Sequence, residues 1–209
     1  IGNITKGDTT PSNHTLTVAS SGASVVTLAV SSGTPTIANT DLPASRRLIV
    51  SAKLAGTDGL AIAGGGMVQL ANTGSGYSGA TTINTNCGTL VLTETGAARN
   101  TAVTVNVGGV LQVGDLATSV DRPDRLSDAA TLTLAGGTLA LMGRAGASSS
   151  ETLGTLALAD NRAGKVQSVV SPTGGSAARW NITGLTRAAN QGATVNFQGL
   201  GVDLGSATA

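Results

Sequence analysis

The sequence predicts an all-β protein built as a parallel β-solenoid, in which successive coils of short strands stack on one another. Three observations predict this fold: strand-like segments with period-two alternation, a recurring glycine-led unit, and an unusual composition. The 209 residues include 30 glycines, and 11% are charged and 1% aromatic. Ordinary soluble domains contain about 7% glycine and about 25% charged residues. We therefore expect a regular structure with glycine-rich corners and a narrow aliphatic interior.

The glycine-led unit has the pattern Gly-x-aliphatic-x-aliphatic. It begins at Gly33, Gly66, Gly88, Gly109, Gly137 and Gly154. The three copies at 66–70, 88–92 and 109–113 follow one another at spacings of 22 and 21 residues, and the next spacings are 28 and 17. The first copy is weakened by Pro35. A repeat of about 21 to 22 residues is typical of a solenoid coil with three strands and three turns.

Other short segments between these anchors alternate aliphatic and small polar residues, as half-buried strands do. They contain Leu60 with Ile62, Thr81 with Ile83, Val103 with Val105, Leu132 with Leu134, and Val166 with Val169. Short strands separated by glycine and polar turns are compatible with a β-sandwich or a solenoid. The repeat favours the solenoid, because a sandwich has no reason to reuse one strand sequence at a fixed spacing. Matched aliphatic residues such as Leu90, Leu111 and Leu139 are then expected to form one interior row.

Residues 1–209 are expected to form one continuous module of roughly nine coils, about 43 Å long at ~4.8 Å per coil. Neither end contains an amphipathic helix or a charged, proline-rich shield. Unpaired strand edges recruit other chains unless they are covered. The sequence therefore predicts continuation at the ends, either as a longer chain or as a neighbouring copy.

Charge and cysteine content exclude several classes of function. The 12 Lys and Arg balance 11 Asp and Glu and are scattered apart from Arg46 and Arg47, so we expect no nucleic-acid partner. Cys87 is the single cysteine, which offers neither a disulfide nor a zinc site. The apolar runs are far shorter than the ~20 residues that a membrane helix needs, so this segment is not expected to insert into a membrane. With one histidine and no nucleophile motif, we expect no catalytic residue, cofactor or metal centre.

The best polar cluster lies in the longest excursion from the repeat, residues 115–128. It consists of Asp115, Asp121, Arg122, Asp124, Arg125 and Asp128. Its carboxylates are weak candidates for binding calcium or a sugar, or for the acid and base of a solenoid lyase or glycosidase. The alternative is a solvated loop whose charges pair locally. Because no charged position recurs at 21 to 22 residues, the pattern favours the loop.

Residues 54–92 carry a family resemblance. Gly64-Gly65-Gly66 is followed by Asn72, by Tyr77-Ser78-Gly79, by Thr81-Thr82-Ile83-Asn84 and by Gly88-Thr89-Leu90. This order resembles the passenger-associated β-strand repeat of bacterial autotransporters. It departs from the family at Cys87 and in the extra residues between Asn72 and Tyr77. Residues 132–205 resemble, less closely, the flanking solenoid of very long surface proteins with this repeat.

The resemblance implies a right-handed parallel β-helix that is secreted or displayed on a bacterial surface. The function expected is a non-enzymatic stalk, spacer or fibre subunit. The expected partners are other copies, associated end to end or laterally, or flanking solenoid repeats. One alternative is an adhesin that binds a carbohydrate or a host protein through residues 115–128. Another is a solenoid polysaccharide-degrading enzyme, since the fold alone does not define an activity.

Overall fold

The protein is all-β in the part of the chain that its structure describes. A computed structural model describes residues 1–7, 14–41, 46–72, 76–86, 88–93, 95–116, 121–170, 176–187, 192–201 and 204. Within these ranges the secondary structure consists of eighteen strands and no helix. The prediction of an all-β chain is therefore confirmed for the described residues.

Sixteen of the strands form two eight-stranded sheets. In spatial order, the first sheet contains β1 (Asn3–Lys6), β4 (Thr36–Asn39), β7 (Leu60–Ala63), β9 (Thr81–Ile83), β11 (Val103–Asn106), β13 (Leu132–Ala135), β15 (Ser148–Leu158) and β17 (Ala177–Arg187). The second contains β2 (Leu16–Val18), β5 (Arg47–Val50), β8 (Met67–Leu70), β10 (Thr89–Leu92), β12 (Val110–Val113), β14 (Thr138–Gly143), β16 (Ala163–Val170) and β18 (Thr194–Leu200). A two-stranded sheet pairs β3 (Val25–Thr27) with β6 (Lys53–Ala55).

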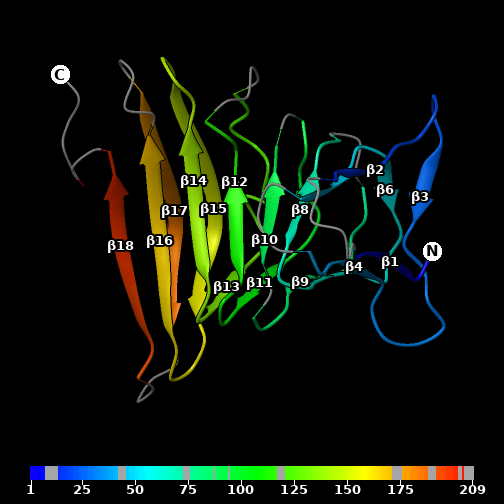
Figure 1. Cartoon of the computed structure of the whole chain (residues 1–209). Coiled ribbons are helices and arrows are strands. Elements are labelled where there is room, and N and C mark those ends of the chain that lie inside the picture. The colour runs from blue at the N-terminus through cyan, green and yellow to red at the C-terminus, as the bar shows by residue number, and fades with distance from the viewer. Residues whose placement is uncertain are drawn as a thin grey trace.

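The chain contributes strands to the two large sheets alternately. Each strand pairs in parallel with the previous strand of the same sheet. The strands therefore stand side by side in sequence order from one end of the molecule to the other (Figure 1). This topology is compatible with a parallel β-helix or solenoid. Each large sheet has eight strands, so the described chain makes eight passes rather than the roughly nine expected.

A third side connects the second sheet back to the first. It begins with β3 and β6 and continues through backbone hydrogen bonds from Gly76 to Leu54 and from Ser78 to Gly56, at 2.8 and 3.0 Å. Further along, an isolated bridge joins Ala98 to Leu126. The first halves of β15 and β17 pair with each other on this side, and the end of β15 pairs with β13 in the first sheet.

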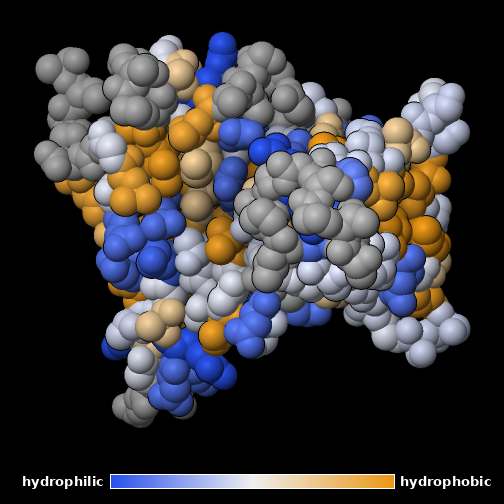
Figure 2. Space-filling view, viewed as in Figure 1, coloured by the Kyte–Doolittle hydropathy of each residue, from blue (hydrophilic) through white to orange (hydrophobic). Residues whose placement is uncertain are grey.

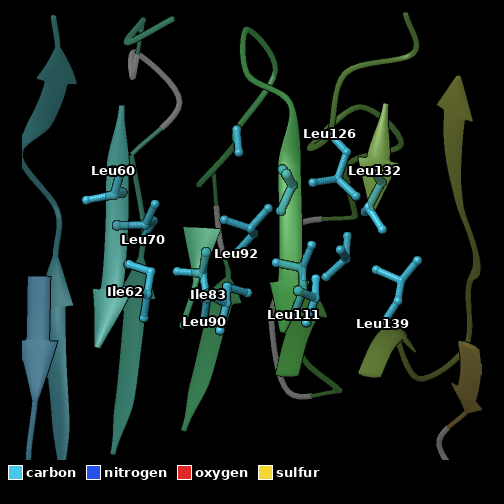
Figure 3. Packing of buried hydrophobic residues seen from close by; sticks show 14 of the residues in the cluster. Leu60, Ile62, Leu70, Ile83, Leu90, Leu92, Leu111, Leu126, Leu132 and Leu139 are labelled. Atoms are coloured by element: carbon cyan, nitrogen blue, oxygen red, sulfur yellow. The ribbon is translucent and has the colours of Figure 1, made fainter. Parts of the chain in front are cut away.

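Aliphatic side chains form continuous rows inside the stack. Leu90 pairs with Leu111, and Leu111 pairs with Leu139; none of the three has exposed surface. The interior row expected from the repeat is therefore confirmed. Figure 3 shows these leucines in line with other buried aliphatic residues between the strands. Parallel strands lie about 4.8 Å apart, so each side chain contacts the equivalent side chain of the next coil.

Two copies of the glycine-led unit do not belong to this row. The copy at Gly154 is part of β15, where Leu156 pairs with Leu132 in the first sheet. The copy at Gly33 leads into β4, which also belongs to the first sheet. The glycine-led unit thus occurs as a strand in both sheets, and the irregular spacing of 17 residues before Gly154 accompanies the change of sheet.

Two neighbouring glycines at a corner have different structural roles. Gly108 has a φ of 75°, a left-handed conformation that side chains rarely adopt. Gly109 follows it with an ordinary φ, but a Cβ there would lie 2.8 Å from the Ile83 side chain on the preceding coil. The corners therefore need one glycine for backbone conformation and another for close approach between coils.

Candidate functional site: the excursion and the two end faces

The four candidate aspartates of the excursion differ in exposure. Asp115 is half-buried, whereas Asp121, Asp124 and Asp128 are exposed. Asp124 is paired with Arg99 on the preceding coil, where Arg99 Nε lies 3.2 Å from Asp124 Oδ2 and 2.5 Å from the Asp124 carbonyl oxygen. Residues 117–120 of the excursion lie outside the described residues. The local charge pairing that the loop interpretation expects is thus present at Asp124.

A search of the described residues for metal sites finds no group of three or more His, Cys, Asp or Glu side chains that could hold an ion. Calcium or sugar binding by the excursion therefore remains a hypothesis from the sequence. Cys87, which the sequence predicts to form neither a disulfide nor a zinc site, lies outside the described residues.

One member of the polar cluster is not solvated. Arg125 is 2% exposed, and its Nη1 donates to the Leu92 carbonyl at 3.4 Å. Its backbone N–H donates to both carboxylate oxygens of Glu151, at 3.0 and 3.1 Å, and the Leu126 N–H donates to Glu151 Oε1 at 2.8 Å. The expectation of a solvated loop is wrong at Arg125, because Glu151 anchors this part of the excursion to the next coil through hydrogen bonds from two backbone amides.

Glu151 itself was not singled out in the sequence, although a signal existed. Ser149, Glu151 and Leu153 alternate along β15, and all three are buried. Burial raises the pKa of Glu151 to about 7, against the lowering effect of the hydrogen bonds from Leu126 and Arg125 and the Arg125 charge. A carboxyl group without exposed surface cannot reach a substrate. We therefore interpret Glu151 as a structural residue.

A second buried charge pair lies in the first pass of the chain. Lys6 Nζ forms an ion pair with Asp41, and the two residues are 6% and 4% exposed. The Lys6 carbonyl also accepts hydrogen bonds from Thr40. The pair joins the ends of β1 and β4, where it holds the first pass against the second.

The remaining notable surface is apolar and lies at the two ends. Among the described residues, the exposed large hydrophobic side chains are Ile1, Leu16, Val25, Leu185, Phe197, Leu200 and Leu204. The first three precede β4, and the other four lie in or after β17. We call these two groups the N-terminal face and the C-terminal face. Figure 2 shows hydrophobic surface at both ends of the molecule.

The C-terminal face also contains a cavity of about 390 Å³. It is lined by Val166, Ser168, Ala178, Arg179, Trp180, Ile182, Phe197, Gln198 and Leu204. Trp180 is fixed by a hydrogen bond of 2.9 Å from its Nε1 to the Gln167 carbonyl. Two of the three aromatic residues of the chain thus lie at this end, while the third, Tyr77, is buried in the core. The cavity is the open end of the hydrophobic interior.

No family model, curated protein or solved structure matches this chain. A separate search of the described residues finds no helix with the length and hydropathy to cross a membrane.

Proposed function

We propose that this chain is a non-enzymatic structural module, a stalk, spacer or fibre subunit of a bacterial surface protein, folded as a right-handed parallel β-helix. The single observation that carries the proposal is the continuity of the interior rows. Buried aliphatic residues follow one another through the eight-stranded sheets, while the large apolar side chains that are exposed in the described part of the chain lie on the two end faces. A molecule built this way extends by adding coils.

Right-handed winding is supported by the geometry of parallel connections. A crossover between parallel strands of one sheet is right-handed in about 98% of cases, because twisted strands pack back onto the sheet only in that sense. With eight strands at ~4.8 Å spacing, the module spans roughly 34 Å between its first and last strands. The module would act as a spacer of that length.

An extracellular location is supported by the resemblance in residues 54–92 and by the resistance to proteolysis that the topology favours. Proteases cleave exposed, poorly bonded loops. Several of the basic residues that trypsin recognises are instead held in strands: Lys6, Arg47, Lys53, Lys165, Arg179 and Arg187. We expect the native protein to remain largely intact under trypsin conditions that digest the urea-unfolded chain within minutes. Rapid digestion of the native chain at these strand positions would overturn the proposal.

An adhesin is the second candidate, supported by the exposure of Asp121 and Asp128 on the excursion. Because Asp124 is paired with Arg99, Asp121 is the better residue to test. Glycan-array binding that is lost in Asp121→Ala and retained in Asp160→Ala, at an exposed aspartate outside the excursion, would favour the adhesin. Turnover of an acidic polysaccharide would instead favour an enzyme and contradict the structural proposal.

A further inference from the structure

The two end faces carry the first and last members of the same interior row. Leu16 pairs with Leu48, and the row continues through Val68, Leu90, Leu111, Leu139 and Val166 to Phe197. The members between the two ends are at most 2% exposed, whereas Leu16 is 41% and Phe197 is 44% exposed. Each terminal side chain therefore lacks the neighbour that every other member of its row has.

The two strands that carry these side chains, β2 and β18, are the edge strands of the second sheet. Within the described residues, β2 pairs only with β5, and β18 pairs only with β16. All strands of the second sheet run parallel. The outer edge of β18 can therefore pair in parallel with the outer edge of β2 in another copy, and the direction of the sheet is kept. A strand edge of this kind pairs readily with a further strand.

We infer that the second sheet binds a second copy of this chain head to tail, with the edge of β18 in one copy pairing in parallel with the edge of β2 in the next. This inference rests on the proposed structural function and specifies its partner. Continuing the register places Leu16 of one copy beside Phe197 of the other, at the mouth of the cavity. Because the two surfaces differ, such a contact is heterologous and produces open filaments rather than closed dimers.

The first sheet is less suited to this contact. Its interior row from Ile4 ends at Arg187, which pairs with Leu158 and donates from Nη1 to the Ala193 carbonyl at 3.3 Å. A charged residue at an inward position of an edge strand opposes the addition of a further strand. The second sheet carries no charge at the equivalent place, because the end of its row is Phe197.

Cysteine cross-linking tests the arrangement. In a background with Cys87→Ser, one protein carries Leu16→Cys and another carries Phe197→Cys. Paired parallel residues lie about 4.8 Å apart, within the 4.4 to 6.8 Å that a disulfide accepts between Cα atoms. We expect a mixture of the two proteins to give mainly the mixed disulfide dimer under mild oxidation. Predominance of a Phe197→Cys homodimer would indicate tail-to-tail pairing and overturn the inference, as would the absence of any cross-link.

A second measurement does not depend on cysteine chemistry. Sedimentation velocity of the unmodified chain should show association that increases with concentration. Phe197→Asp should weaken it at least tenfold, while Ala129→Asp, at an exposed residue that belongs to neither end face, should leave it unchanged. Equal association in both variants contradicts the inference. A chain that stays monomeric but resists trypsin overturns the association alone, whereas loss of trypsin resistance overturns the proposed function.

Discussion

At the scale of single residues, stability depends on side chains that repeat from coil to coil. Leu111 is fully buried between Leu90 and Leu139, so its removal leaves a cavity that the adjacent coils cannot easily fill. We expect Leu111→Ala to lower the free energy of unfolding by ~2 to 5 kcal/mol. Urea denaturation at low protein concentration measures this change. Leu185→Ala is the matched control, because Leu185 is 55% exposed, and its cost should be below about 1 kcal/mol. Equal costs would show that Leu111 does not face the interior.

Glu151 should make stability depend on pH in a direction unusual for a carboxylate. Its pKa is raised by burial from 4.5 to about 7, so between these values the folded state keeps a proton that the unfolded state has lost. The stabilisation is complete below pH 4.5 and is lost as the pH rises to 7, a difference of roughly 3 kcal/mol.

The comparison with Glu151→Gln isolates this effect, since glutamine does not titrate and keeps an oxygen that can accept the Leu126 amide. Urea denaturation between pH 4.5 and 7.5 should show wild-type stability falling relative to the variant. If the two proteins keep a constant difference over this range, Glu151 does not titrate there and the assignment is wrong.

Residues with a local alternating pattern could be placed from the sequence, whereas residues that are buried by a distant partner could not. The alternation around Leu90 and Leu111 was enough to place them inside. The same alternation in β15 would have placed Glu151 inside with Leu153. Arg125 gave no such signal, because its buried side chain bonds to the Leu92 carbonyl, a partner that is distant in the sequence.

At the scale of elements, the strands are held close together by glycines at the corners. Gly88 precedes β10, and a Cβ there would lie 2.0 Å from the Gly66 carbonyl oxygen on the preceding coil. The coils would have to separate locally to admit it.

We therefore expect Gly88→Ala to destabilise the protein by about 1 to 3 kcal/mol. Gly184→Ala is the control, because its Cβ would meet only atoms of Thr155, the nearest being Oγ1 at 3.4 Å, and its φ is not left-handed. That change should be neutral or stabilising by up to ~1 kcal/mol. Thermal unfolding followed by circular dichroism compares the two, and a lower midpoint for Gly184→Ala than for Gly88→Ala would contradict the role assigned to close approach.

The order of the strands could be predicted from the repeat only where the repeat is regular. From Gly66 to Gly137 each glycine-led strand joins the second sheet beside the previous one. At Gly154 the same local sequence enters the first sheet, because β15 is long enough to form both the third side and the first sheet in one strand. A five-residue pattern carries no information about which side of the coil it occupies.

At the scale of the whole molecule, the glycine content is about twice that of ordinary soluble domains, and aromatic residues are few. Both features are consistent with narrow, closely stacked coils. The core still accommodates one ring, Tyr77, whose hydroxyl lies 2.9 Å from Thr81 Oγ1. Trp180 and Phe197 occur where the interior is open at its end. The placement of aromatic residues thus distinguishes the filled interior from the C-terminal face.

The central claim is that the chain is a parallel stack rather than an antiparallel sandwich, and nuclear Overhauser effects between backbone protons test it most directly. In this 20.3-kDa protein, the register predicts contacts linking Thr89 to Val110 and Val110 to Thr138, with the parallel pattern throughout the second sheet. Strong contacts between opposed Hα protons of strands adjacent in sequence, such as β11 with β12, would show antiparallel hairpins and contradict the account.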